Sequence, residues 1–118
     1  MRIIAINVAG DQVGEGFGRA HTVVVAQIDG GAIQEWIPYD VGWDVAHDQA
    51  ASHGAHHATI VRFLNDHDVD AVVSGHIGPP MAHTLEAMGV AAYVGVTGDA
   101  REAALHAAAD FTPSDPAA

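Results

Sequence analysis

The order of its short apolar runs and turns constrains the fold of this chain most. Three runs of β-branched and apolar residues come first and cover residues 2–8, 21–28 and 32–38. Runs of this length, bounded by glycine and aspartate, are typical of strands. Between the last two runs, Asp29-Gly30-Gly31 supplies residues that tolerate a positive φ, which predicts a β-hairpin. We therefore expect three strands before any helix.

Helical spacing begins only after residue 52. Ser52 can cap a helix over residues 53–67, in which inward positions recur at i, i+3, i+4 and i+7. These positions are His57, Ile60, Val61 and Leu64. Gly78-Pro79-Pro80 then predicts the start of a second helix, which ends at Gly89.

Two short buried runs separate the predicted helices. Residues 71–75 and 90–96 predict the fourth and fifth strands. Asp99 and Glu102 have the spacing of a capping box and predict a third helix. Three strands are thus followed by helix, strand, helix, strand and helix. This order is typical of an α/β domain with a mixed five-stranded sheet and helices on its faces.

Length and composition indicate one domain. The chain has 118 residues, and its 49% hydrophobic content can fill one core. We expect this domain to cover residues 1–110 and the Pro-rich residues 111–118 to form a flexible tail. No run reaches the roughly 20 apolar residues that a membrane span needs, and the N-terminus lacks the features of a signal peptide. The expected location is the cytoplasm, with no membrane partner.

Charge and cysteine content exclude several functions. Four Lys and Arg residues oppose 15 Asp and Glu residues, which gives a net charge of -11. A nucleic-acid binder needs a basic surface that neutralises phosphates, so we expect no nucleic-acid partner. The absence of cysteine removes thiolate nucleophiles and thiolate metal ligands. Zinc fingers and ordinary iron–sulfur sites are therefore excluded.

Nine histidines are many for a chain of this length. His53 and His57 share the apolar stripe of their predicted helix, whereas His56 is expected to lie to the side. An i, i+4 histidine pair can share a metal ion, and His76 after the fourth strand can supply a third imidazole. The predicted metal ligands are therefore His53, His57 and His76. The alternative is that they pack inside the protein with hydrogen-bond partners. Three others are expected on the surface: His67, His83 and His106.

Open sheets of this kind bind ligands at the carboxyl ends of their parallel strands. Four segments are expected there: the glycine-rich loop 10–20, the start of the helix 53–67, and residues 74–78 and 95–99. Three helix N-termini would point free N–H groups into this region, and such ends favour anions. An acidic protein can thereby offer a locally positive pocket.

The segments that carry these loops resemble a known family. Phe17-Gly18-Arg19-Ala20 and the run 69–78, with Gly75-x-x-Gly78-Pro79, are similar to motifs of the dinitrogenase iron-molybdenum cofactor biosynthesis family, which includes NifX, NafY and the C-terminal part of NifB. The resemblance covers residues 1 to about 110. It implies a ribonuclease H-like three-layer α/β/α domain. The cofactor-binding residues that it implies are Phe17, Gly18, Arg19, Gly75 and Gly78.

The resemblance also implies a role with nitrogenase cofactor precursors. Relatives often have a histidine before the Phe-Gly pair, where this chain has Gly16, so His21 or another histidine would have to replace that ligand. The lack of thiolates suits transient binding, because stable iron–sulfur clusters are normally held by cysteine. We expect a non-enzymatic accessory protein that binds or carries an iron–sulfur or iron–molybdenum-type cluster, or a divalent metal ion, and that meets a cofactor-assembly protein.

Two other functions stay open. One is a module that binds a small anion or a protein without metal. In that module Trp36, Tyr39 and Trp43 would anchor a partner or a homodimer instead of covering the end of the sheet. The other is a metal-dependent hydrolase, which is less favoured. The first strand offers Asn7 and no carboxylate, and the chain has no Walker loop and no Gly-x-Ser-x-Gly or His-Glu-x-x-His motif.

Overall fold

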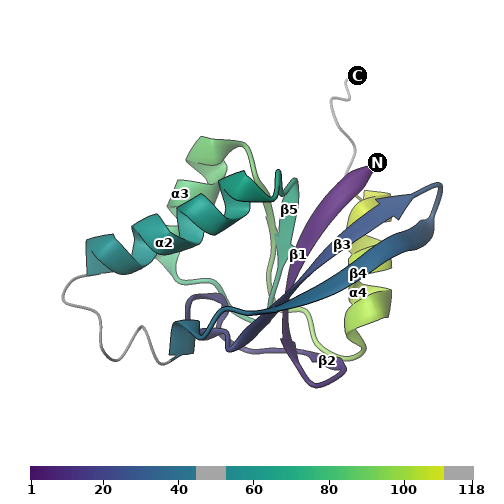
Figure 1. The fold of residues 1–118 in the computed structure, drawn as a ribbon, viewed down its shortest axis with the longest axis horizontal. Coiled ribbons are helices and arrows are strands. Elements are labelled where there is room, and N and C mark those ends of the chain that lie inside the picture. Colours follow the sequence, from purple (N-terminus) through teal and green to yellow (C-terminus); the bar gives the residue numbers. More distant parts are fainter. Residues whose placement is uncertain (45–52, 111–118) are drawn as a thin grey trace.

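A computed structural model describes residues 1–44 and 53–110, with only the backbone of residues 53–55 (Figure 1). Its elements in chain order are β1 (Arg2–Ala9), β2 (Gln12–Val13), the 3-10 helix η1 (Phe17–Arg19), β3 (Thr22–Asp29), β4 (Ala32–Asp40), α2 (His53–Asp66), β5 (Ala71–Val73), α3 (Pro79–Met88), β6 (Ala91–Tyr93) and α4 (Ala100–Asp110). Ser52 and the expected tail 111–118 lie outside the described residues. None of the described helices is long and apolar enough to cross a bilayer.

The strands form one mixed sheet in the order β4-β3-β1-β5-β6. β3 is antiparallel to both β1 and β4, whereas β1, β5 and β6 are parallel to one another. The mixed sheet is therefore confirmed, but the count of five strands is wrong. A sixth strand, β2, folds back on β1, where Val13 is opposite Val8. Gly10 has φ 64° and permits this tight turn, and two residues are too few to show a strand pattern.

Helices cover both faces of the sheet, which gives three layers (Figure 1). On one face, Ala5 and Val72 pack in a core cluster with Ile60 of α2 and Leu85 of α3. On the other face, alternate strand residues pack against the alanines of α4, which include Ala104. Alternation along β1 therefore sends its side chains into two separate cores. The three-layer α/β arrangement is confirmed.

Local turn chemistry places several boundaries where the sequence predicts them. Gly30 and Gly31 have positive φ between β3 and β4. α3 begins after the N-cap Gly78, and it ends at Gly89, whose φ of 76° is left-handed. At the start of α4, the N–H of Glu102 donates to the Asp99 carboxylate over 2.9 Å, as in the predicted cap. Strands are predicted over residues 71–75 and 90–96, but β5 and β6 are shorter and end at Val73 and Tyr93.

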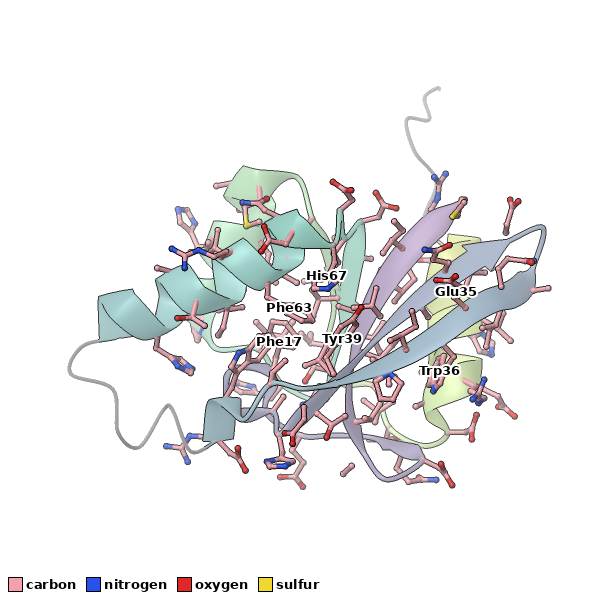
Figure 2. The ribbon with its side chains drawn as sticks, in the orientation of Figure 1. Phe17, Glu35, Trp36, Tyr39, Phe63 and His67 are labelled. Carbon is pink, nitrogen blue, oxygen red and sulfur yellow. The ribbon has the colours of Figure 1, made fainter. Side chains whose placement is uncertain are left out.

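The aromatic residues after β3 do not form one exposed surface. Trp43 is 2% exposed and packs in the core on the α2 face. Tyr39 contacts Phe63 and His67, and Figure 2 shows these three rings between β4 and α2. Trp36 lies on the opposite face, beneath the guanidinium of Arg101 at 4.4 Å. These residues therefore do not form one surface that could anchor a partner or a homodimer.

Candidate functional site

A pocket of about 360 Å³ lies beyond the carboxyl end of β5. Three segments meet there: the loop with η1, the first turns of α2, and the chain from His76 into α3. We call it the histidine pocket. Its lining residues are Gly16, Phe17, Gly18, Arg19, His56, His57, Ile60, His76, Gly78, Pro80 and Met81. Four of the five cofactor-binding residues implied by the family resemblance are among them.

The η1 loop is anchored by Phe17. The backbone N–H of Phe17 donates to the carbonyl oxygen of His76 over 3.0 Å, and Gly16 forms a parallel bridge with His76. The ring of Phe17 is fully buried, with its centroid 5.4 Å from that of Trp43 in an edge-on contact. Gly18 and Arg19 are thereby presented at the rim of a fixed loop.

His56 faces inward, which corrects the expectation that it lies to the side. It is only 7% exposed, and its Nε2–H donates to the carbonyl oxygen of Gly18 over 2.7 Å. The imidazole therefore ties α2 to the η1 loop. His56, Ile60 and Leu64 recur at i, i+4 and i+8, so the sequence allowed this stripe as well as the one through His57.

His57 and His76 are the other two imidazoles of the histidine pocket; His57 is half-buried and His76 is exposed. His53 is the first residue of α2, and its side chain lies outside the described residues. Within the part that is described, no three His, Cys, Asp or Glu side chains lie close enough to hold a metal ion. The triad of His53, His57 and His76 therefore stays a prediction.

The other histidines divide between packing and surface positions. His67 is not a plain surface residue, because its Nδ1–H donates to the backbone carbonyl oxygen of Phe63 over 2.8 Å and its ring packs on Tyr39. His83 and His106 are exposed, as expected. His21, the suggested replacement for the missing ligand at Gly16, does not line the histidine pocket.

His21 lies between two carboxylates. Its Nε2 is 3.1 Å from Asp40 Oδ1 and its Nδ1 is 3.2 Å from Asp44 Oδ1. The hydrogen bond to Asp44 and the charges of both aspartates raise the pKa of His21. This exposed ion pair links the start of β3 to the end of β4 and does not supply a ligand to the pocket.

Two expected contributions to this edge need correction. Pro79 and Pro80 occupy the first two positions of α3, and proline has no N–H. These two positions therefore offer an anion no N–H donor, contrary to the prediction. Gly75 is not part of the pocket lining; a Cβ on it would lie 3.1 Å from both Glu15 Cα and the Gly14 carbonyl oxygen.

The fourth expected segment, residues 95–99, contributes to a different pocket on the α4 face. That pocket, which we call the acidic pocket, measures about 530 Å³. Asp99, Glu102 and Asp110 line it together with Tyr93. Partial burial raises the pKa of the Tyr93 hydroxyl, and Asp110 raises it further. The two pockets thus have opposite chemical character.

The electrostatics of the histidine pocket contrast with the rest of the chain. Among the described residues that line it, none carries a carboxylate, although the chain has 15 Asp and Glu and a net charge of -11. Arg19 supplies a guanidinium, and three histidines supply imidazoles that can donate or accept. Phe17, Ile60 and Met81 provide apolar walls. This arrangement favours an anion with some apolar surface.

Comparison with known proteins identifies relatives of the whole domain. A family model described as dinitrogenase iron-molybdenum cofactor matches residues 1–110. The apo form of the orange protein from Desulfovibrio gigas is similar in structure, with a TM-score of 0.65 and 24% identity over 93% of this chain and 88% of that chain. None of the curated proteins compared with the chain is significantly similar to it.

Two further structures share the fold. A NifB-like protein from Thermotoga has a TM-score of 0.63 and 23% identity, over 93% of this chain and 90% of that chain. A dinitrogenase-related protein from Methanocaldococcus jannaschii has a TM-score of 0.58 and 14% identity, over 89% of this chain and 86% of that chain. At these identities, the similarity supports the architecture only.

Proposed function

This chain belongs to the dinitrogenase iron-molybdenum cofactor family, and from that premise we propose that it is an accessory protein that binds or carries an anionic metal cluster. The proposed cargo is an iron–sulfur or iron–molybdenum-type cluster, held in the histidine pocket. The same proposal implies a partner protein that assembles the cofactor. The protein itself would perform no reaction on the cluster.

The absence of carboxylates among the pocket's described lining residues carries this proposal. An acidic protein repels anions over most of its surface, so a site without carboxylates that contains Arg19 is the place where an anionic cluster is least opposed. Fixed charges near a partly enclosed pocket act through a lower dielectric than bulk water. The local field therefore favours the ligand despite the net charge.

The ligand chemistry of the pocket favours release as well as binding. His57 and His76 offer imidazole nitrogens to exposed metal atoms, and Met81 adds a polarisable sulfur to the wall. Because the chain has no thiolate, it lacks the ligands that hold iron–sulfur clusters permanently. A pocket of this composition suits a protein that passes its cargo on.

Metal analysis of the untagged protein, purified anaerobically, tests the proposal. The ligand-free protein is then titrated with a reconstituted iron–sulfur cluster and with tetrathiomolybdate, a stable molybdenum–sulfide dianion. We expect the variant His57→Ala to weaken binding about tenfold, on the order of one charge-assisted hydrogen bond or metal contact. The variant His53→Ala tests the remaining predicted ligand in the same assay.

The control is His83→Ala, which removes an exposed histidine of α3 outside the pocket. Equal affinities for wild type, His57→Ala and His53→Ala would contradict metal or cluster binding by these imidazoles. The same would follow if the wild type bound neither probe.

A second candidate is a module that binds a small oxyanion without metal. Arg19 and the lack of described carboxylates would attract any small anion, so this observation also favours molybdate or phosphate. Titration with both oxyanions distinguishes the two functions. Tighter binding of an oxyanion than of tetrathiomolybdate would favour the second candidate.

A further inference from the structure

Two buried polar residues behind the histidine pocket join the loops that form it. We propose that Asn7 and Ser74 are positioning residues, which hold the loop 14–19 and the segment 74–78 in the arrangement that binds the ligand. This inference rests on the proposed function. It assigns a role to two residues that do not line the histidine pocket.

Ser74 directly follows β5 and is fully buried. Its hydroxyl is within hydrogen-bond distance of two carbonyl acceptors, Glu15 at 3.2 Å and His76 at 3.1 Å. One acceptor belongs to each ligand-carrying segment. The hydroxyl of Ser74 therefore connects the two segments directly.

Asn7 lies near the carboxyl end of β1, is 3% exposed, and contacts Ser74 beyond the neighbouring strand β5. Its Nδ2–H donates to Ser74 Oγ over 3.2 Å. The backbone carbonyl of Asn7 also accepts the N–H of Gly14 over 2.8 Å. Asn7 thus contacts both the side chain that joins the segments and Gly14 in the glycine-rich loop.

The hydrogen bonds continue from this pair to the pocket wall. The carbonyl of His76 accepts from Ser74 and also from the backbone N–H of Phe17 at 3.0 Å. Phe17 begins η1, which carries Gly18 and Arg19. A change at Ser74 is therefore transmitted to the pocket through a single shared carbonyl.

Two glycines allow the segments to approach closely enough for these bonds. A Cβ on Gly14 would lie 2.7 Å from Asn7 Oδ1, and one on Gly75 would lie 3.1 Å from the Gly14 carbonyl oxygen. The N–H of Gly75 donates to that carbonyl over 2.9 Å. We call Asn7, Gly14, Ser74 and Gly75 the loop junction. This role explains why Gly75 belongs to the motif without lining the pocket.

Buried hydrogen bonds of this kind reduce the entropy lost on binding. A loop that is already fixed in its binding arrangement loses little further conformational freedom when the ligand arrives. Loosening the loop junction should therefore weaken binding without unfolding the sheet. A purely structural role would instead lower global stability and leave the affinity of the folded protein unchanged.

The test compares Ser74→Ala, Asn7→Ala and the double variant with Thr84→Ala as control. Thr84 also donates its hydroxyl to a backbone carbonyl, that of Pro80 at 3.0 Å, but within α3. Affinity for tetrathiomolybdate, thermal unfolding, and amide hydrogen exchange at Phe17 and at Val24 in the core strand β3 are measured. Val24 reports global opening, whereas Phe17 reports the loop.

We expect Ser74→Ala to raise amide exchange at Phe17 about tenfold and to weaken probe binding about tenfold, with Val24 unchanged. Asn7→Ala should have the same effects, and the double variant should be no worse than the stronger single variant, because both act through one set of bonds. If Ser74→Ala does not fold, Asn7→Ala carries the same comparison.

Unchanged affinity in both variants, or exchange that rises equally at Phe17 and Val24, would overturn the positioning role. A wild type that fails to bind the probe would overturn the proposed function instead. In that case the exchange data alone decide the inference. A local rise at Phe17 supports the loop junction, and no rise rejects it.

Discussion

The histidine pocket and the acidic pocket lie on opposite faces of one sheet and differ in charge and in packing. The first contains Arg19 and three histidines, with no carboxylate among its described lining residues. The second contains Asp99, Glu102 and Asp110. The net charge of -11 therefore does not describe the histidine pocket. Net charge is a sum over the whole chain, whereas the fold determines which charged side chains lie near each pocket.

The cores beneath the two pockets differ as well. Large aromatic and aliphatic side chains fill the face under α2 and α3, including Phe17 and Trp43. On the other face, α4 contributes only alanines to the buried residues, such as Ala104. We therefore expect most of the packing energy, as well as the ligand, on the α2 side.

The largest expected effect is a loss of stability, and it tests the difference between the two cores. Phe17→Ala should lower the free energy of unfolding by about 3–5 kcal/mol, because a fully buried ring is replaced by a cavity. Ala104→Gly should cost only about 1 kcal/mol, mainly through helix propensity. Urea unfolding monitored by circular dichroism measures both. Equal losses would mean that the two faces contribute alike.

The next effect concerns charge in the histidine pocket. Arg19→Glu should weaken tetrathiomolybdate binding about 100-fold, because it replaces the guanidinium with a carboxylate at the rim. Arg62→Glu makes the same change in net charge on the exposed surface of α2 and serves as control. Isothermal titration at low salt measures both affinities. Similar losses in the two variants would show that net charge, and not the pocket, governs binding.

A smaller effect is expected at the acidic pocket. Asp99→Ala should destabilise the protein by about 1 kcal/mol, because the N–H of Glu102 loses its cap. Asp99→Asn keeps a capping oxygen and should leave stability nearly unchanged. Neither variant should alter probe affinity, since the residue lies on the opposite face. Any change in affinity that exceeds the error of titration would argue against independent pockets.

The smallest effect is the pH dependence of the His21 ion pair outside both pockets. Asp44 and Asp40 raise the pKa of His21 in the folded protein, so the charged form stabilises the fold. This contribution is complete below the ordinary histidine pKa of about 6.5 and is lost as pH rises through the raised value. His21→Gln should therefore lower the thermal unfolding midpoint slightly near pH 5.5 and not near pH 9. His83→Gln is the control, and a deficit equal at both pH values would contradict this account.

Residues whose effect is local were predictable from the sequence. Gly30, Gly31 and Gly89 adopt the positive φ for which glycine is suited, and Asp99 caps α4 as its spacing indicates. The family motif also contains Phe17, Gly18, Arg19 and Gly78, which lie together in the lining of one pocket. In each case neighbouring residues in the chain, or a motif, contain the necessary information.

The orientation of α2 was not predictable in this way. Stripes centred on His56 or on His57 both satisfy a 3.6-residue period. The inward position of His56 depends on the Gly18 carbonyl, 38 residues earlier in the chain. The strand β2 was missed for a similar reason, because its two residues gain their partners only when Gly10 turns the chain onto β1.

By itself, the sequence determined the order of strands and helices, the turns between them and the family to which the chain belongs. Only the tertiary structure separated residues 95–99 from the histidine pocket and brought Asn7, Gly14, Ser74 and Gly75 into contact. The physical reason is the separation along the chain over which each kind of interaction acts. Propensities and caps act over a few residues, whereas a pocket and its supporting hydrogen bonds join groups up to 67 residues apart, as between Asn7 and Ser74.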